Sequence, residues 1–464
     1  MRFLLDFVLK YSNALNNKNK IPRLRLLSKI EIGFRRLILR LPPKTLLILI
    51  CILIGVVAGL SAFFLKSLLQ TVHNFIELFS NKSLSNILLV TLPIIGLFLT
   101  VLYFSIFHPK GFKKGISQIL DSIKNNSSII EPNQTYGHII SSSFTIGFGG
   151  SAGFEAPIVA TGSAIGSNIA RFFKISKNER TVLLASGAAA GISAIYNAPI
   201  AGVLFAIEVL LVDMSVTAFI PLLLSSATAA IVSRILFQGQ LFVLITSQWN
   251  LHAIPIYIVL GIIAGLYSVI IIRQSIKINV IFNRIDNKWI RVGIGSIILS
   301  LLILIFPSLF GDGYFSLQSI LNHQSISILN DSFIHINNNF ILIPILVLLF
   351  VKIYATGITI SAGGNGGIFA PSVFMGGFLG YLISSTINLT GLMELNTVNF
   401  TVVGMAGVLS GVIKIPLTAV FLIAEITGGY VLLVPLMIVS AISYFISSYF
   451  ESKSIYTKEL EMKA

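Results

Sequence analysis

Length, composition and charge place this chain in a membrane. Its 464 residues are 55% hydrophobic and only 11% charged, and its mean hydropathy is +0.91, whereas about 25% of residues are charged in an ordinary globular domain. We therefore predict an all-α polytopic membrane protein. The net charge of +15 does not indicate a nucleic acid partner, because 11 of the 32 Lys and Arg residues fall within residues 1–44 instead of covering a folded face.

The basic segment 1–44 is typical of a cytoplasmic flank, since positive residues stay on the inner side of a membrane and can also bind anionic lipid. The single cysteine, Cys51, lies in an apolar run, which excludes an intrachain disulfide and a cysteine-based metal cluster. Six scattered histidines lack the spacing of metal ligands. We expect neither a metal nor another cofactor.

The first half of the membrane part, residues 45–250, begins with two clean spans. Thr45–Leu69 and Asn86–Phe107 are long enough to cross a bilayer of about 30 Å. A polar stretch follows, with a short helix expected near Gly115. From Tyr136 to Phe237, Gly and Pro repeatedly interrupt the apolar pattern, which predicts short, tilted or broken helices. Such breaks persist at membrane depth only when they are buried in protein or line a watery cavity.

The second half, residues 251–450, opens with a span over Ile254–Ile272 and a basic surface between Arg273 and Arg291 that should be cytoplasmic. The polar loop Gly311–Asn339 carries no Lys or Arg and should face outward. Later elements are a broken helix after Gly363, and helices over Thr401–Ile413, Leu417–Ile426 and Val431–Phe450. We expect the short tail 451–464 to be cytoplasmic, like the N-terminus.

The stretch from Gly149 to Pro157 stands out, because it holds three glycines, a proline and one carboxylate in a region almost free of charge. Ile158–Phe173 reads as a helix, so Glu155 lies at a helix N-terminus. There the N–H groups lack intrahelical partners and the dipole favours an anion. An ionisable residue inside a membrane is a functional candidate by default. A carboxylate and a mobile anion would compete for the same N–H groups.

Two alternatives remain for this stretch, and one for the protein as a whole. The stretch could be a helix-packing turn with a capping glutamate, as in many soluble proteins. It also matches the nucleophile pattern G-x-S-x-G at Ser151, which would suggest an intramembrane hydrolase. That pattern requires a preceding strand and a positioned base, and the sequence indicates neither. A transporter of an organic or cationic solute is the remaining alternative.

Internal repeats support a pathway built from two halves. Gly55-Val-Val-Ala-Gly-Leu60 recurs at Gly261–Leu266, Gly153–Pro157 recurs at Gly367–Pro371, and Gly187–Glu208 aligns on Gly404–Glu425. The offsets are 206, 214 and 217 residues, so the order is kept with small insertions. Paired segments interrupted by Gly and Pro predict two inverted-topology repeats with a site at the membrane midplane, built from half-helix ends.

These motifs resemble the CLC family of chloride channels and chloride/proton exchangers, from about Lys44 to Tyr456. Gly153-Phe-Glu-Ala-Pro157 is similar to the family's G-R-E-G-P, and Gly367-Ile-Phe-Ala-Pro371 to its G-x-F-x-P. Asn197-Ala-Pro-Ile-Ala-Gly202 resembles a further signature. Tyr456 matches the tyrosine whose hydroxyl closes the inner side of the family's central anion site.

The resemblance implies a homodimer in the cell membrane, with one chloride pathway per subunit and no C-terminal CBS domains. It makes Glu155 the gate and Glu208 a candidate for the proton path. The residues that it assigns to anion binding are Gly153, Phe154, Glu155, Ala156, Gly367, Ile368, Phe369, Ala370, Tyr456, Lys114, Gly115 and Ile116.

Three departures from the family pattern bear on mechanism. The filter motif G-S-G-I-P falls on Lys113-Lys-Gly-Ile-Ser117, so Lys114 replaces a serine. Lys114 could lie in a cytoplasmic turn or point inward and strengthen anion binding. Phe154 and Ala156 replace Arg and Gly around the gate. Val209 stands where the family's exchangers carry an internal glutamate, while its neighbour Glu208 has a repeat mate in Glu425, which suggests a structural partnership at a helix end.

The sequence therefore predicts chloride transport through a glutamate-gated pathway and no enzymatic activity. Because an apolar stretch does not carry protons without titratable groups or water, Val209 favours passive, channel-like flow. The alternative is proton-coupled chloride/proton antiport, through Glu208 or a chain of water molecules.

Overall fold

The computed structural model describes residues 42–78, 82–109, 111–210, 216–237, 247–321 and 342–463. The basic segment 1–44 and the outward loop near residues 320–335 lie mostly outside these ranges, so their expected sides of the membrane stay predictions. Residues 1–50 and 51–464 form two separate units. All described regular elements of the second unit are helices, apart from one isolated β-bridge.

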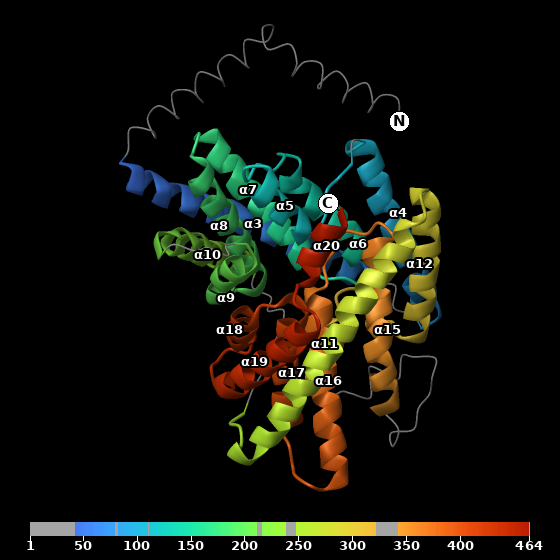
Figure 1. Cartoon of the computed structure of the whole chain (residues 1–464). Coiled ribbons are helices and arrows are strands. Elements are labelled where there is room, and N and C mark those ends of the chain that lie inside the picture. Colours follow the sequence, from blue (N-terminus) through green and yellow to red (C-terminus); the bar gives the residue numbers. More distant parts are fainter. Residues whose placement is uncertain are drawn as a thin grey trace. The chain divides into compact units, whose positions relative to one another are not determined.

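Eight helices in the described ranges are long and apolar enough to cross a membrane. They carry the labels of Figure 1: α3 Pro43–Leu78, α4 Lys82–Phe107, α10 Val216–Leu236, α11 Ile254–Asn283, α12 Lys288–Ile305, α15 Leu342–Ser361, α16 Phe369–Thr390 and α19 Leu433–Phe450.

Shorter helices fill the regions where Gly and Pro interrupt the sequence. They are α5 Ile116–Asn125, α6 Gln134–Gly147, α7 Glu155–Phe172, α8 Lys177–Tyr196, α9 Pro199–Phe205 with a π-helical turn over Ala206–Leu210, α13 Tyr314–Leu321, α17 Thr397–Ile413, α18 Pro416–Ile426 and α20 Ile455–Lys463. These bounds agree with the broken helices expected between Tyr136 and Phe237.

Helix α11 is longer than the sequence predicted, and the tail, for which no element was predicted, is helical. Helix α11 continues to Asn283 instead of ending at Ile272, because Ile278 and Phe282 are buried against Ile358 and Ala362. The Nε of Arg273 also donates to the Oε1 of Glu451 at 2.6 Å. The tail forms a helix, α20, which contacts α5. The C-terminal segment is thereby part of the packed molecule.

The repeated Gly-x-x-x-Gly patterns have equivalent roles. Gly55 and Gly59 of α3 lie against α10, and a Cβ atom at Gly55 would come within 2.6 Å of the Ser225 carbonyl oxygen. Gly261 and Gly265 of α11 lie against α19 in the same way. Small residues allow close helix approach in a membrane. Each repeat therefore uses its glycine pair to hold its own first and last long helices together.

Two groups of helices, one from each repeat, also match. Helix α7 packs on α8, and α16 packs on α17. Figure 1 shows α7–α10 in green and α16–α19 in orange to red as two groups that meet where α9 lies beside α18. This is the arrangement expected of two repeats that share one interface.

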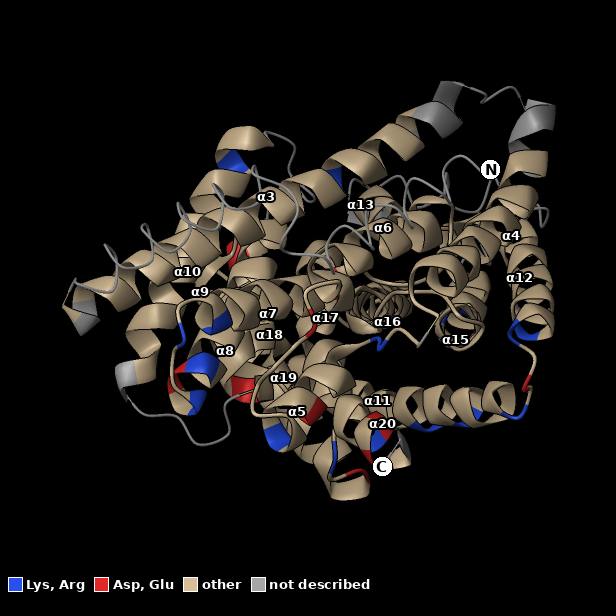
Figure 2. Ribbon diagram, turned by 90° about the horizontal axis from the view of Figure 1, so that it is seen from above, with Lys and Arg blue, Asp and Glu red and all other residues tan. Residues whose placement is uncertain are grey.

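Charged residues are rare in the centre, where Lys66, Lys352 and Glu155 are buried. Figure 2 shows Lys, Arg, Asp and Glu gathered around α5, α8, α11 and α20. Helices α6, α16 and α17 carry no charged residue. A buried carboxylate in this region is therefore exceptional and needs an explanation.

Candidate functional site

The stretches around Gly153 and Gly367 are joined by an antiparallel β-bridge. The Gly153 N–H donates to the Gly367 carbonyl at 2.8 Å, and the Gly367 N–H donates to the Gly153 carbonyl at 2.7 Å. Each glycine also packs against the other stretch, where a Cβ atom would overlap Ala370 or Ala156. The two glycines thus hold the repeats together, and their own N–H groups are already paired.

Helices α7 and α16 begin two residues after the bridge and have matching starts. The residues before them, Phe154 and Ile368, have φ/ψ of −87°/−1° and −88°/−2°. The first intrahelical bonds run from Ile158 N to Phe154 O and from Ser372 N to Ile368 O. The N–H groups earlier in each first turn have no intrahelical acceptor. Two anion-attracting helix ends therefore lie side by side.

Glu155 is fully buried at the start of α7. Its Oε2 accepts a hydrogen bond from the Ala370 N–H in the first turn of α16, at 3.3 Å. Its Oε1 accepts hydrogen bonds from the Tyr314 hydroxyl at 2.8 Å and from the Tyr196 hydroxyl. The carboxylate of one repeat thus bonds an N–H group at the helix start of the other.

A cavity of about 210 Å³ reaches the same helix starts from another side. Seven residues that the sequence assigned to the anion site line it: Lys114, Gly115, Ile116, Ala156, Gly367, Ile368 and Tyr456. The others, Phe154, Glu155, Phe369 and Ala370, belong to the adjoining helix starts, and Gly153 faces Gly367 through the bridge. The structure therefore brings the predicted residues into one region.

Three hydroxyls that line this cavity have no hydrogen-bond partner in the described part of the chain, those of Ser275, Tyr456 and Thr356. Ser275 is half-buried, whereas the other two residues are buried. Tyr456 is 4% exposed and Thr356 is 1% exposed. A buried polar group without a partner costs free energy unless a ligand or water satisfies it. Both buried hydroxyls are thus suited to bind a small anion or water.

The two lysines of the altered filter motif have different roles. Lys113 is largely exposed and pairs with Asp121 at 3.3 Å. A hydrogen bond from Asn125, with Lys113 nearby, holds the pKa of Asp121 below its ordinary value against the opposing effect of burial. Lys114 is half-buried, and its Nζ donates to the carbonyls of Gly363 at 2.7 Å and Gly364 at 3.2 Å. Its side chain therefore points inward and lines the cavity.

Glu208 and Glu425 each cap the start of the other's helix. The Glu208 carboxylate accepts from the N–H groups of Leu417 at 3.0 Å and Thr418 at 2.7 Å, at the start of α18. The Glu425 carboxylate accepts from Ile200 at 3.1 Å and Ala201 at 2.9 Å, at the start of α9.

The neighbouring Val209 is half-buried in the π-helical turn. The geometry therefore matches the helix-end partnership that the repeat suggested for the two glutamates.

Ser151 is not arranged as a nucleophile. Its side chain is fully buried, its Oγ accepts a hydrogen bond from the Lys352 Nζ at 2.9 Å, and its N–H donates to Thr359 Oγ1 at 3.2 Å. The hydroxyl thus satisfies a buried cation behind the loop that carries Glu155. In the described ranges, no cluster of His, Cys, Asp or Glu could hold a metal.

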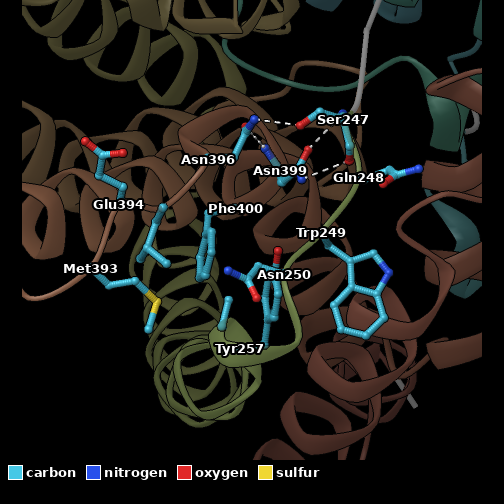
Figure 3. A pocket seen from close by; sticks show the side chains of 12 residues that line it. Ser247, Gln248, Trp249, Asn250, Tyr257, Met393, Glu394, Asn396, Asn399 and Phe400 are labelled. Atoms are coloured by element: carbon cyan, nitrogen blue, oxygen red, sulfur yellow. Dashed lines mark hydrogen bonds between the residues drawn. The ribbon is translucent and has the colours of Figure 1, made fainter.

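A second cavity, of about 190 Å³, lies between the loops that precede α11 and α17 (Figure 3). Asn399 exchanges hydrogen bonds with the backbone of Ser247 at 3.0 and 3.3 Å, and Asn396 donates to the Ser247 hydroxyl at 2.7 Å. The rings of Tyr257 and Phe400 stack at 4.3 Å. These groups clamp the two loops together, and the cavity shares no lining residue with the Glu155 region.

Sequence reasoning missed Tyr196, Tyr314 and Thr356. Tyr196 directly precedes the recognised Asn197–Gly202 signature, so its position was the available signal. Tyr314 lies 159 residues from Glu155 in the chain, inside a loop that was predicted only to face outward. Thr356 lies in a long apolar helix, where a threonine usually bonds its own helix backbone.

The profile of a protein family described as "Voltage gated chloride channel" matches residues 96–448. A ClcB-like protein of Ralstonia nicotianae, named as a chloride channel protein, is 28% identical over 75% of this chain and 80% of its own length. A ClcA protein of Vibrio cholerae, named as an H(+)/Cl(-) exchange transporter, is 31% identical over 68% of this chain and 66% of its own length.

Solved structures share the fold. A slow cyanobacterial Cl⁻/H⁺ antiporter superposes with a TM-score of 0.78 at 22% identity, over 91% of this chain and 98% of that chain. A CLC-type fluoride/proton antiporter gives a TM-score of 0.72 at 25% identity, over 89% and 97%. The polytopic helical architecture is therefore shared along nearly the whole described chain.

Proposed function

Because this chain belongs to the CLC family of chloride channels and transporters, we propose that it exchanges chloride for protons across a membrane, with Glu155 as the gate. One observation carries the proposal: the Glu155 carboxylate accepts a hydrogen bond from the Ala370 N–H in the first turn of α16. An anion would bind at this helix N-terminus. The carboxylate therefore occupies a place that a chloride ion would take.

Gating follows from the charge of this one side chain. As a carboxylate, Glu155 is attracted to the helix starts of α7 and α16 and excludes chloride from them. Protonation removes that attraction, so the side chain can withdraw and chloride can bind the N–H groups of the first turns. Because the donors are backbone groups, exchanging side chains such as Phe154, Ala156 or Ile368 changes anion binding less than their position suggests.

The inner cavity provides the next binding position. Here the hydroxyls of Tyr456 and Thr356 are available to a chloride ion, and the Lys114 ammonium adds positive charge to the lining. A site of this kind must still release its ion, because conduction requires moderate binding at each step. Lys114 meets this need, since two backbone carbonyls hold its ammonium and moderate its attraction for the anion.

Coupling to protons is supported by the relatives. The Vibrio cholerae protein is named as an H(+)/Cl(-) exchange transporter, and a fluoride/proton antiporter shares the fold at 25% identity. These weigh against the passive flow that Val209 favoured in the sequence. Passive chloride flow remains the second candidate function, because Val209 offers no titratable group and the Glu208 carboxylate is engaged by α18.

Proton movement in liposomes under an imposed chloride gradient distinguishes the two. We expect uphill proton uptake by the purified protein, and none by Glu155→Gln, which cannot carry the proton. Chloride current that reverses at the chloride equilibrium potential, whatever the pH gradient, would instead establish passive flow. Fluoride in place of chloride in the same assay identifies the preferred anion.

The same family membership supports a homodimer with one pathway per subunit and both termini in the cytoplasm. The basic segment 1–44 agrees with this orientation. Labelling of single cysteines introduced near residue 20 and residue 460, in a Cys51→Ala background, tests it in intact cells. Labelling of either position from outside would contradict the orientation.

A further inference from the structure

Two tyrosines hold the Glu155 carboxylate, and they come from different repeats. Tyr314, at the start of α13, donates to Glu155 Oε1 at 2.8 Å, and the Tyr196 hydroxyl at the end of α8 bonds the same oxygen. The two hydroxyl oxygens also lie in contact, but each hydroxyl has one proton, so the two do not bond each other while both donate to Glu155. Tyr196 is 7% exposed and Tyr314 is 5% exposed. Water therefore has little access to replace either contact.

Tyr314 is fixed by a segment that is docked on the loop before Glu155. The Gly311 N–H donates to the Gly149 carbonyl at 3.2 Å, and the Phe310 ring lies where a Cβ atom of Gly149 would be. The Tyr314 N–H donates to the Asp312 carboxylate at 3.0 Å. The phenol is thus anchored through its own backbone and does not depend on Glu155 for its position.

Tyr196 is anchored independently. The Nζ of the buried Lys66 donates to the Ala194 carbonyl at 2.8 Å and to Ser233 Oγ at 3.1 Å, near the C-terminal end of α8. The Tyr196 ring lies 6.1 Å from that of Phe369, centroid to centroid. Both phenols are therefore presented to the carboxylate by rigid surroundings.

We propose that Tyr196 and Tyr314 are positioning residues that hold the ionised Glu155 in the closed pathway and set the external pH at which it opens. This inference rests on the proposed gating role of Glu155. A carboxylate accepts both phenol hydrogen bonds, which are stronger when the acceptor is charged. The protonated side chain needs them less, so the phenols stabilise the closed state selectively.

Other charged or titratable groups also face this region. Asp312 lies in the segment before α13, Lys352 bonds Ser151 from α15, and Tyr456 lies on α20. The charge of Asp312 acts on Glu155 through space, whereas the two phenols act by direct bonds that a Tyr→Phe exchange removes.

The test is chloride flux from liposomes as a function of external pH. In Tyr314→Phe and in Tyr196→Phe the carboxylate loses one donor, so it protonates more readily and the flux midpoint moves to higher pH. The expected shift is about one pH unit for each hydroxyl. In the double variant the shifts should be less than additive, because both phenols donate to the same oxygen and lie in contact.

Tyr267→Phe is the matched control. It removes a buried tyrosine hydroxyl that donates to the Leu349 carbonyl at 2.7 Å, so it should destabilise the fold similarly and leave the midpoint unchanged. In a Glu155→Gln background, Tyr314→Phe should leave the flux profile unaltered, since no carboxylate remains to be held.

The outcomes separate the inference from the proposed function. If Glu155→Gln retains the pH response of the parent, the gating role is wrong and the inference falls with it. If Glu155→Gln loses that response but both Tyr→Phe midpoints coincide with that of Tyr267→Phe, the gate stands and the holding role is refuted. A midpoint shift to lower pH would also refute it.

Discussion

At two places in the described part of the molecule, a carboxylate of one repeat accepts hydrogen bonds from the start of a helix in the other repeat. Only one of these two contacts is symmetric. Glu208 and Glu425 are repeat mates, and each accepts two backbone N–H groups of the partner's short helix. Glu155 bonds the start of α16, but its own repeat mate is Phe369, which has no carboxylate to return. Glu208 and Glu425 are half-buried, and each has a repeat mate that makes the same kind of contact. Glu155 is fully buried, and its repeat mate makes no such contact.

The difference distinguishes a structural contact from a functional one. In a reciprocal pair, both carboxylates have their hydrogen bonds in the same arrangement. The pair therefore stabilises the interface between α9 and α18, and moving either side chain would break bonds without forming new ones. An unreciprocated buried carboxylate keeps an expensive charge at membrane depth. The burial of this carboxylate is explained if another anion can take its place.

The largest effect should come from Glu155→Ala. The flux of the parent should depend on external pH as one titrating group does, by up to about tenfold per pH unit. In the variant the flux should be faster and should change less than about twofold over the same range, because no side chain competes for the helix starts. Chloride efflux from liposomes at several external pH values measures this. A parent-like pH response would return Glu155 to the role of a capping residue.

Removing either member of the symmetric pair should reduce stability and leave gating intact. Glu208→Gln and Glu425→Gln each weaken charge-assisted bonds at a helix start, which should lower the free energy of unfolding by about 1–3 kcal/mol. The loss should be at least as large for Glu208→Gln, which also weakens a bond from the Thr418 hydroxyl at 2.6 Å, as judged by thermal unfolding in detergent. If Glu208→Gln stopped proton movement while Glu425→Gln did not, the symmetry would be broken and Glu208 would belong to the proton path.

Lys114→Met tests whether the inner side of the Glu155 region depends on a cation. Loss of the positive charge that lines the cavity should weaken chloride binding roughly tenfold, or about 1.4 kcal/mol. Chloride titration by calorimetry measures the affinity. Lys113→Met is the matched control, because it removes only an exposed pair with Asp121, and such pairs contribute at most about 1 kcal/mol to stability. Equal affinities in the two variants would refute this role.

The smallest expected effect concerns the two buried hydroxyls of the cavity that have no partner in the described residues. Thr356→Val and Tyr456→Phe should each weaken chloride binding by about threefold to fivefold, as expected for one neutral hydrogen bond of about 1 kcal/mol. Thr401→Val is the control, because its hydroxyl bonds its own helix at the Thr397 carbonyl at 2.7 Å. Tighter binding in Thr356→Val would mean that water, and not chloride, satisfies that hydroxyl.

The sequence was sufficient for the fold class and for part of the site. Both helix starts could be located from local signals. These signals were the interruptions by Gly and Pro, the repeat offsets and the motifs around Glu155 and Phe369. The Glu208–Glu425 partnership was also suggested, since repeat mates point to equivalent positions. The exact end of α11 was missed, because its last turns are packed through contacts of Ile278 and Phe282 with residues distant in the sequence.

What the sequence could not provide were contacts between distant side chains. The bond from Tyr314 to Glu155 depends on a docked loop, and the inward turn of Lys114 depends on carbonyls about 250 residues away. Thr356 could not be recognised from the sequence, because only the side-chain rotamer decides whether its hydroxyl bonds its own helix or faces a cavity. Passive flow and proton exchange could not be distinguished either, because that distinction depends on a few titratable side chains and not on the fold.

The bridge between Gly153 and Gly367 has a consequence for biosynthesis. During translation the first stretch leaves the ribosome 214 residues before its partner exists. Until then the Gly153 N–H and carbonyl have no mate, and unpaired backbone groups are costly in lipid. The first half must therefore wait near water or inside the insertion machinery, and the ion pathway is completed only when the second half inserts and closes the bridge.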